Sequence, residues 1–194
     1  LPADSAEATS IAPLTDQQMT DASTLIVRGT VEKVWVERDR DGTIWSRARI
    51  RVDRVLKGTD TSDTIVVDNL GGTYGDTIAS VEGAARFSEG EDTLVYLDQI
   101  GGGRYTPVAM FMGKYTVRRA PGEDELSVQR FHPVSGVTFD HRFMPYAQAT
   151  DRVYLNDVMD RIETELDKGW DGTPVPGLSA ERLQQINTPT WRRR

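Results

Sequence analysis

Residues 25–56 read LIVRGTVEKVWVERDRDGTIWSRARIRVDRVL, and this stretch decides the fold. Apolar and polar residues alternate through its first part, which is the period of a half-buried β-strand. The alternation changes parity at Lys33, so we expect a β-bulge that bends the strand. Asp41-Gly42 is the signal of a two-residue hairpin turn, and alternation resumes from Ile44. The stretch therefore predicts one long, strongly bent β-hairpin.

Further short strands, separated by glycine-rich turns, come after the hairpin. Runs rich in β-branched and aromatic residues predict strands at residues 64–69, 93–97, 104–110, 114–119 and 125–131. The run GGTYG at residues 71–75 is expected to be a flexible loop. Short strands with turn signals at this spacing are typical of an all-β barrel or sandwich.

The chain divides into three parts on its sequence pattern. Residues 1–14 lack any periodicity and are expected to form a flexible arm. Thr15 opens a capping-box pattern, which predicts a short helix over residues 16–23. We expect residues 15–168 to form a single β-barrel domain with a C-terminal helix, and residues 169–194 to form an extended tail.

The C-terminal helix is predicted from apolar residues at three- and four-residue spacing. These residues are Val153, Leu155, Val158, Met159, Ile162 and Leu166. Thr150 or Asp151 can cap the start of this helix, and Gly169 stands where a C-cap belongs. A further short helix can start at Ser179 and run to Ile186.

Composition excludes several classes of protein. The chain has 194 residues and a net charge of −7, whereas non-specific nucleic-acid binding depends on a basic surface. It contains no cysteine, which removes disulfides, thiol nucleophiles and cysteine-ligated metals. No apolar run approaches the roughly 18–20 residues of a membrane span. We therefore expect no membrane span, and the sequence assigns no cofactor and no metal.

Two stretches that suggest ligand-binding loops lack the residues such loops need. Asp39 and Asp41-Gly42 resemble the start of a calcium loop, but Ala48 stands where a carboxylate is required. The loop at residues 71–75 lacks a Gly-Lys-Ser/Thr sequence, and no helical pattern comes directly after it. We interpret the first as a hairpin turn and the second as a loop without phosphate-binding function.

The two histidines raise the question of catalysis. His141 has Asp140 beside it, and His132 lies nearby in the sequence. A zinc site needs three or four convergent ligands, and these residues do not supply the spacing. No Gly-x-Ser-x-Gly elbow occurs in the chain. We interpret both as loop or surface histidines and assign no catalytic residue. A hydrolase or metal-dependent enzyme at His132, Asp140 and His141 stays open as an alternative.

Three motifs resemble those of a known class of proteins. Residues 24–31 read TLIVRGTV, residues 52–58 read VDRVLKG, and residues 87–97 read FSEGEDTLVYL. With the Gly-Gly loop, they resemble uncharacterised exported bacterial proteins over about residues 22–117. Those proteins look like OB-fold barrels, similar to the netrin-like domain of the tissue inhibitors of metalloproteinases. The resemblance implies a mainly β fold, an OB-like closed or partly open antiparallel barrel with a short N-terminal helix and a C-terminal amphipathic helix.

The resemblance to the inhibitors does not extend to their mechanism. They chelate the protease zinc through an N-terminal cysteine, whereas this chain begins with Leu1-Pro2 and has no cysteine. Its polar opening reads like the start of a processed exported protein, so we expect a periplasmic, secreted or cell-surface location.

Arginines at alternate positions share one face of the return strand of the hairpin: Arg47, Arg49 and Arg51. In an OB-fold, such a face can hold single-stranded nucleic acid, with Trp35 and Trp45 as stacking platforms. Binding of single-stranded nucleic acid through these arginines is the second alternative function. We favour a solvated face on which the arginines pair with Glu32 or Glu37 of the partner strand.

The hypothesis that these observations favour is a non-enzymatic, exported binding module. It recognises a protein, such as one associated with a protease, or an extracellular polymer. Loops on a rigid barrel are the usual place for recognition. The candidate binding residues are accordingly Tyr74, Gly72, Trp45, Asp41 and Tyr105. The sequence leaves the oligomeric state open.

Overall fold

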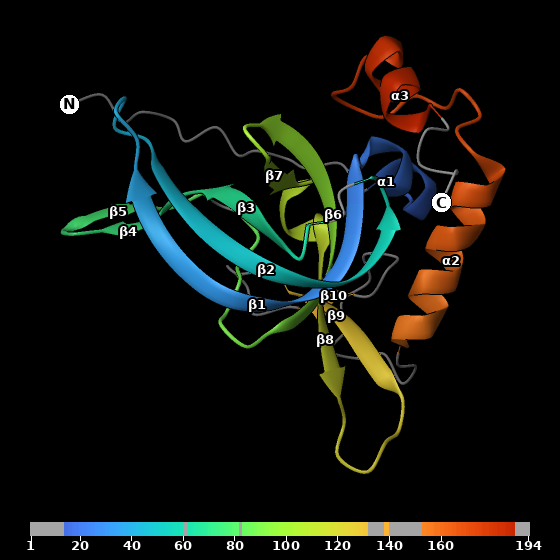
Figure 1. The fold of residues 1–194 in the computed structure, drawn as a ribbon, viewed down its shortest axis with the longest axis horizontal. Helices are drawn as coiled ribbons and strands as arrows, with labels where there is room; N and C mark the ends of the chain where they lie inside the picture. Colours follow the sequence, from blue (N-terminus) through green and yellow to red (C-terminus); the bar gives the residue numbers. More distant parts are fainter. Residues whose placement is uncertain (1–13, 60–61, 82, 132–137, 140–152, 189–194) are drawn as a thin grey trace, which may run out of the picture.

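The computed structural model describes residues 14–59, 62–81, 83–131, 138–139 and 153–188 (Figure 1). The elements in chain order are α1 (Asp16–Ala22), β1 (Leu25–Arg38), β2 (Ile44–Lys57), β3 (Thr64–Leu70), β4 (Gly72–Tyr74), β5 (Thr77–Ala79), β6 (Asp92–Gly101), β7 (Arg104–Pro107), the 3₁₀ helix η1 (Met110–Gly113), β8 (Lys114–Arg119), β9 (Leu126–Phe131), β10 (Thr138–Phe139), α2 (Leu155–Lys168) and α3 (Ala180–Asn187). The fold is mainly β, as predicted.

Five strands of the main sheet close into a ring. Hydrogen bonds join β1 to β2, β2 to β3, β3 to β7, β7 to β6, and β6 back to β1. The ring agrees with the predicted barrel-like fold, and β8, β9 and β10 continue the sheet from β6. The strand pairs of the ring are antiparallel, as predicted, except β3 and β7, which run parallel. A closed ring with an odd number of strands cannot alternate direction at every pair, so one parallel pair is unavoidable.

The β1–β2 hairpin is long and curved, as the sequence predicts (Figure 1). The expected register shift next to Lys33 is confirmed, and further shifts lie nearer the start of β1. At Gly29, a Cβ atom would collide with the carbonyl oxygen of Arg51 on β2, so only glycine permits this approach of the two backbones. Such irregularities increase the local twist and allow the strands to curve around the core.

The turn of this hairpin is longer than predicted. Residues 39–43 join the strands, with Asp39 N donating to Thr43 O at 2.8 Å and Gly42 N donating to Asp39 O at 3.0 Å. A two-residue type I′ turn needs positive φ at both Asp41 and Gly42. Only Gly42 adopts it, with φ of +92°, so the predicted two-residue turn is wrong in length.

The sheet separates two apolar cores, and β1 contributes to both because its successive side chains point to opposite faces. One core fills the ring and includes Val27, Val31, Ala48, Ile50, Val67 and Leu97. The other lies between the sheet and the helices and includes Met19, Ile26, Tyr96, Leu155, Ile162 and Leu183.

The N-terminal helix α1 has the predicted capping box. Thr15 Oγ1 accepts from Gln18 N, and Gln18 Oε1 accepts from Thr15 N, both at 3.1 Å. The predicted flexible arm at residues 1–14 lies outside the described residues except for Leu14. That residue is buried in the core beneath the helices, so the last residue of the predicted arm belongs to the folded domain.

Helix α2 buries the predicted apolar stripe. Its N-cap is Tyr154 rather than Thr150 or Asp151, which lie outside the described residues. A β-bridge to Ser127 keeps Tyr154 extended, so the helix begins after it. Gly169 ends α2 as expected, with φ of +70°.

The residues after α2 agree with the sequence-based prediction only in part. The predicted short helix is present as α3, but residues 169–188 are not an extended tail. Val175, Leu183 and Ile186 are buried, so this part folds back onto the molecule. Among the described residues, no helix has the length and apolar composition needed to cross a bilayer.

The predicted flexible loop at residues 71–75 is instead the first half of a hairpin. β4 and β5 form a two-stranded sheet that turns at Gly75. Gly71 fixes its base to β2, because its N–H donates to Ile44 O and its carbonyl accepts from Ser46 Oγ, both at 2.8 Å. In Figure 1 this hairpin extends from the end of the molecule opposite α2 and α3.

The strand predicted at residues 104–110 is shorter in the structure. β7 ends at Pro107, and Ala109 and Met110 adopt left-handed backbone with φ of 51° and 59°. Gly113 lies so close to Val108 that a Cβ atom would collide with the carbonyl of that residue. This tight fold of the backbone replaces the last part of the predicted strand.

Candidate functional site

Four of the predicted binding residues lie at one end of the molecule. We call this region the hairpin end, and it consists of the β1–β2 loop at residues 39–43, the first residues of β2 and the β4–β5 hairpin (Figure 1). The four residues are Asp41, Trp45, Gly72 and Tyr74. Residues that are separate in the sequence therefore share one region, as a binding surface requires.

Gly72 positions the hairpin and offers no side chain to a ligand. Its φ is +136°, and a Cβ atom would lie 2.6 Å from Ser46 Oγ and 3.1 Å from a methyl carbon of Val36. The absence of a side chain thus lets β4 pack directly against β1 and β2.

The β4–β5 hairpin concentrates exposed apolar side chains. Large exposed hydrophobic residues in the described part of the chain are few, and three of them belong to this hairpin or lie just before it. These are Leu70, 49% exposed, Tyr74, 47% exposed, and Ile78, 76% exposed. Tyr74 pairs with Thr77, and Thr73 pairs with Ile78, so Tyr74 and Ile78 project from opposite faces of the hairpin.

β5 also presents a free edge. β4 is the one strand paired with it among the described residues, and its other edge faces away from that partner. An unpaired edge leaves backbone donors and acceptors available to an added strand. The hairpin end therefore combines exposed apolar side chains with unused backbone hydrogen-bonding groups.

A cavity of about 340 Å³ lies beneath the hairpin, between its inner side and the mouth of the ring. Two polar side chains that line it donate hydrogen bonds to backbone carbonyls around it. Ser46 Oγ donates to Gly71 O at 2.8 Å, and Asn69 Nδ2 donates to Ala85 O at 2.9 Å. These bonds fix the base of the hairpin and the segment that comes after it.

Trp45 and Asp41 occupy different positions within the hairpin end. Trp45 lies on the outer face of β2 between Glu37 of β1 and Leu70 of β3, and it is half-buried. Asp41 is exposed in the loop, where its carboxylate accepts from Thr43 N at 3.0 Å, and this bond lowers the pKa of Asp41. The side chain of Asp41 therefore stabilises the β1–β2 loop to which it belongs.

Tyr105 does not share this surface. Its side chain is 5% exposed and belongs to the core inside the ring, where Tyr105 pairs with Val67 of β3. The prediction of a surface binding role for Tyr105 is therefore not supported. Its place in an alternating strand next to the outward-facing Arg104 is the signal that could have identified it as a core residue.

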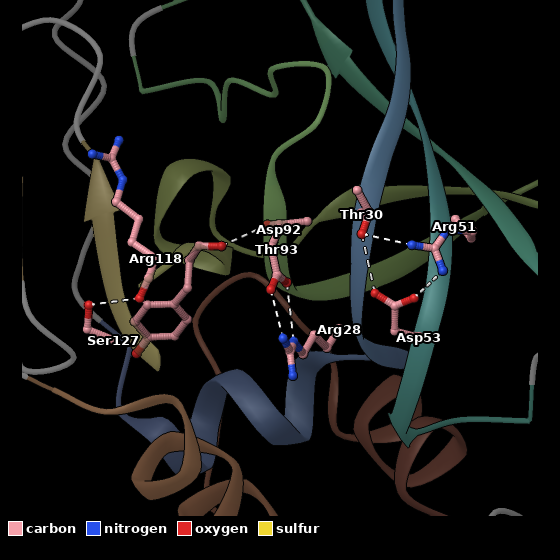
Figure 2. A network of polar contacts seen from close by, with 9 residues as sticks. Arg28, Thr30, Arg51, Asp53, Asp92, Thr93, Arg118 and Ser127 are labelled. Atoms are coloured by element: carbon pink, nitrogen blue, oxygen red, sulfur yellow. Dashed lines mark hydrogen bonds and ion pairs between the residues drawn. The ribbon is translucent and has the colours of Figure 1, made fainter. Parts of the chain in front are cut away.

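The arginines of β2 carry the ion pairs expected for a solvated face. Arg49 Nε lies 3.2 Å from Glu32 Oε2, and Arg47 pairs with Glu37, as predicted. Arg51 donates to Asp53 Oδ1 at 2.6 Å (Figure 2). Each guanidinium already has a carboxylate partner, which reduces the charge available to a nucleic-acid backbone.

Arg47 also reaches a buried carboxylate. Asp68 is 1% exposed; Arg47 Nε lies 3.3 Å from its Oδ1, and Arg104 Nη1 donates to its Oδ2 at 2.8 Å. Burial raises the pKa of Asp68, and the two arginines oppose that effect. The cluster joins β2, β3 and β7 across the outside of the ring.

The alternative site at His132, Asp140 and His141 lies outside the described residues. Within the part of the chain that the structure describes, no three histidine or acidic side chains are grouped as metal ligands would be.

Sequence reasoning missed Leu70 and Ile78. Both flank the glycine-rich run at residues 71–75, whose composition predicts a loop. The signal that could have found them is the sequence TIA at residues 77–79, whose β-branched residues favour a strand and make a short hairpin possible.

No protein-family model and no curated protein matches this chain. Its function is therefore inferred from the geometry of the hairpin end and of the ring that supports it.

Proposed function

We propose that this chain is a non-enzymatic binding module built on an OB-like barrel, and that it recognises another protein through the hairpin end. The topology supports the OB-like assignment. The ring strands in chain order are β1, β2, β3, β6 and β7. Around the ring their order is β1-β2-β3-β7-β6, and β6 pairs with β1 to close it. A five-stranded Greek-key barrel is the architecture of OB-folds.

The observation that carries the proposal is the free edge of β5 flanked by exposed Tyr74 and Ile78. An extended segment of a partner can add to such an edge, with main-chain bonds giving affinity and alternate side chains giving specificity. The apolar side chains on both faces favour an apolar, extended protein segment. Unpaired backbone donors and acceptors can pair with the main chain of a protein segment, which a polysaccharide or a nucleic acid does not offer.

The rigid support of the hairpin strengthens the proposal. Gly71 and Ser46 fix the base of the hairpin to β2, and Gly72 seats it against Val36. A partner strand would therefore meet a pre-positioned edge, which lowers the entropic cost of binding. From the resemblance to exported proteins alone, we infer that this partner is met outside the cytoplasm.

The test compares three proteins that are first checked for equal thermal stability: the wild type, a Tyr74→Ser/Ile78→Ser variant and a Val55→Ser/Ile100→Ser control. The control removes apolar side chains that are 38% and 44% exposed elsewhere on the molecule. Peptides are selected on the wild type from a random-peptide phage library, and their affinities for all three proteins are measured.

We expect selected peptides to alternate apolar and polar residues and to bind the hairpin variant at least about tenfold more weakly, with the control unchanged. Bound peptide should slow amide hydrogen exchange in residues 77–79. Equal affinity for the wild type and the hairpin variant, or failure to select any peptide, would refute the proposal.

A further inference from the structure

A second cavity, of about 620 Å³, lies between the segment that precedes β6 and the strand β8. We call it the β8 cavity. Its volume falls within the range of roughly 300–1,000 Å³ that is usual for small-molecule sites. Arg86 and Phe111 line it together with residues of β8. Some charged side chains of the lining have hydrogen-bonding or ion-pair partners among the described residues, and others do not.

The carboxylates that line the β8 cavity all have partners. Glu89 Oε1 accepts from Val34 N at 3.0 Å, and Asp92 pairs with Arg28 at 2.7 Å (Figure 2). Glu91 accepts from Ser88 N at 3.1 Å and from Lys114 Nζ at 2.5 Å, and Thr116 Oγ1 donates to it as well. Asp92 and Glu91 are therefore ion-paired within the protein, whereas Glu89 is held by a backbone N–H and keeps its negative charge.

Two guanidinium groups of the same cavity differ from Asp92 and Glu91, because they have no partner of opposite charge in the described part of the chain. Arg86 and Arg118 line it from different elements, both are exposed, and neither has a carboxylate partner among the described residues. In Figure 2 the one dashed line at Arg118 joins its backbone carbonyl, not its guanidinium, to Ser127 Oγ, which donates at 3.2 Å. Many other arginines of the described chain are paired with acids, namely Arg28, Arg47, Arg49, Arg51, Arg54, Arg104, Arg161 and Arg182.

β8 arranges polar groups in a row along the cavity. Lys114, Thr116 and Arg118 are alternate residues, so they share one face of the strand. Lys114 is 8% exposed, and burial lowers its pKa, with the positive charge of Arg118 acting in the same direction and Glu91 opposing. An anion near Arg118 would relieve the repulsion between these two cations.

We propose that the β8 cavity binds a small organic molecule that carries a tetrahedral oxyanion, a phosphate or sulfate ester, through Arg86 and Arg118. The planar guanidinium fork donates paired hydrogen bonds to such oxygens. Phe111, which also lines the cavity, would contact the organic body of the ligand. Arg86 also lines the cavity beneath the β4–β5 hairpin, but no residue that lines the β8 cavity belongs to the proposed protein-binding edge of β5.

The experiment titrates the protein at low ionic strength with phenyl phosphate, phenyl sulfate and benzoate, followed by the backbone amide signals of Thr116 and Arg118. The two esters distinguish a phosphate from a sulfate ligand, and benzoate tests a planar carboxylate on the same ring. An Arg86→Gln/Arg118→Gln variant removes the two free cations. Arg40→Gln is the matched control, because Arg40 is exposed and also has no ion pair in the described part of the chain.

We expect saturable binding of at least one ester, weakened about tenfold for each arginine removed and unchanged in the control. Binding should persist in the Tyr74→Ser/Ile78→Ser variant, which separates this result from the proposed protein-binding function. The proposal fails if no ester binds saturably, if benzoate binds as tightly as the esters, or if the double variant retains wild-type affinity.

Discussion

Lys57 Nζ donates a hydrogen bond of 2.7 Å to Asn187 Oδ1, which joins the end of β2 to the last residue of α3. The same amine donates to Thr20 O of α1 at 2.7 Å, and Lys57 is 1% exposed. Asn187 Nδ2 in turn donates to Asp21 O at 2.9 Å. One buried cation thus connects strand β2 of the ring to two helices that are distant in sequence.

Replacing Asn187 by Ala should destabilise the protein by about 1–3 kcal/mol, because the buried amine of Lys57 loses an acceptor. Gln185→Ala is the matched control, since Gln185 is exposed on the same helix, and it should change stability by no more than about 0.5 kcal/mol. Urea unfolding at neutral pH measures both. Equal stabilities of the two variants would show that the bond does not hold α3 in place.

Asp21 should make stability depend on pH in the acidic range. Burial raises the pKa of its carboxyl from 3.8 to about 6, although the nearby Lys57 ammonium opposes the shift. Between these two values the folded protein retains a proton that the unfolded chain releases. The Asp21 carboxyl therefore makes its whole contribution to the free energy of unfolding below pH 3.8, and this contribution is lost as the pH rises to about 6.

The isosteric Asp21→Asn variant isolates this effect because it cannot ionise. We expect the stability of the wild type relative to this variant to fall as the pH is raised from about 4 to about 6. Urea midpoints measured at several pH values across that window provide the test. Parallel pH profiles for the two proteins would rule out a raised pKa for Asp21.

The sequence predicts the local elements of this fold better than their assembly. The β1–β2 hairpin is predictable because side-chain alternation and the parity change at Lys33 are local signals. The closure of β6 onto β1 is not, because pairing between distant strands leaves no periodic mark. The parallel β3–β7 pair results from that closure and is equally hidden in the sequence.

The candidate site is predictable to the same limited degree. Glycine at residues 71 and 72 suggests mobility, yet here Gly72 allows close contact with Ser46 and so fixes a hairpin. Tyr105 comes after a glycine turn, as a binding residue can, but its parity in β7 places it in the core. Exposure depends on which strands close the ring, so the sequence alone could not separate Tyr74 from Tyr105.

Gly29→Ala should be among the most destabilising single substitutions in the described chain. The added Cβ would collide with the backbone oxygen of Arg51 and lie 2.7 Å from Ile50 Cγ2, and a backbone oxygen cannot rotate away. We expect a loss of about 3 kcal/mol or more, at the upper end of the overpacking range.

Gly103→Ala is the control for Gly29. It lies in the β6–β7 turn with φ of +71° and no atom near the added Cβ, so only the left-handed backbone is strained. That strain costs about 1–2 kcal/mol. Thermal and urea unfolding measure the loss of stability in both variants. Equal losses would contradict the explanation that Gly29→Ala is costly because of the collision with Arg51.

Arg47→Met should destabilise the protein much more than Arg51→Met, although both arginines lie on the same face of β2. Arg47 is one of two cations beside Asp68, which is 1% exposed, so its removal leaves a buried carboxylate with Arg104 alone. We expect a loss of about 1–3 kcal/mol. Arg51 pairs with Asp53 at the surface, where their side chains are 52% and 33% exposed, and surface pairs contribute about 0–1 kcal/mol.

A double-mutant cycle distinguishes charge pairing from lost packing of the Arg47 side chain. Asp68→Asn removes the buried charge, so the cost of Arg47→Met should shrink in the Asp68→Asn background. Urea unfolding of the four proteins measures the coupling. If Arg47→Met costs the same in both backgrounds, its effect arises from contacts of the aliphatic part of Arg47 and not from its pairing with Asp68.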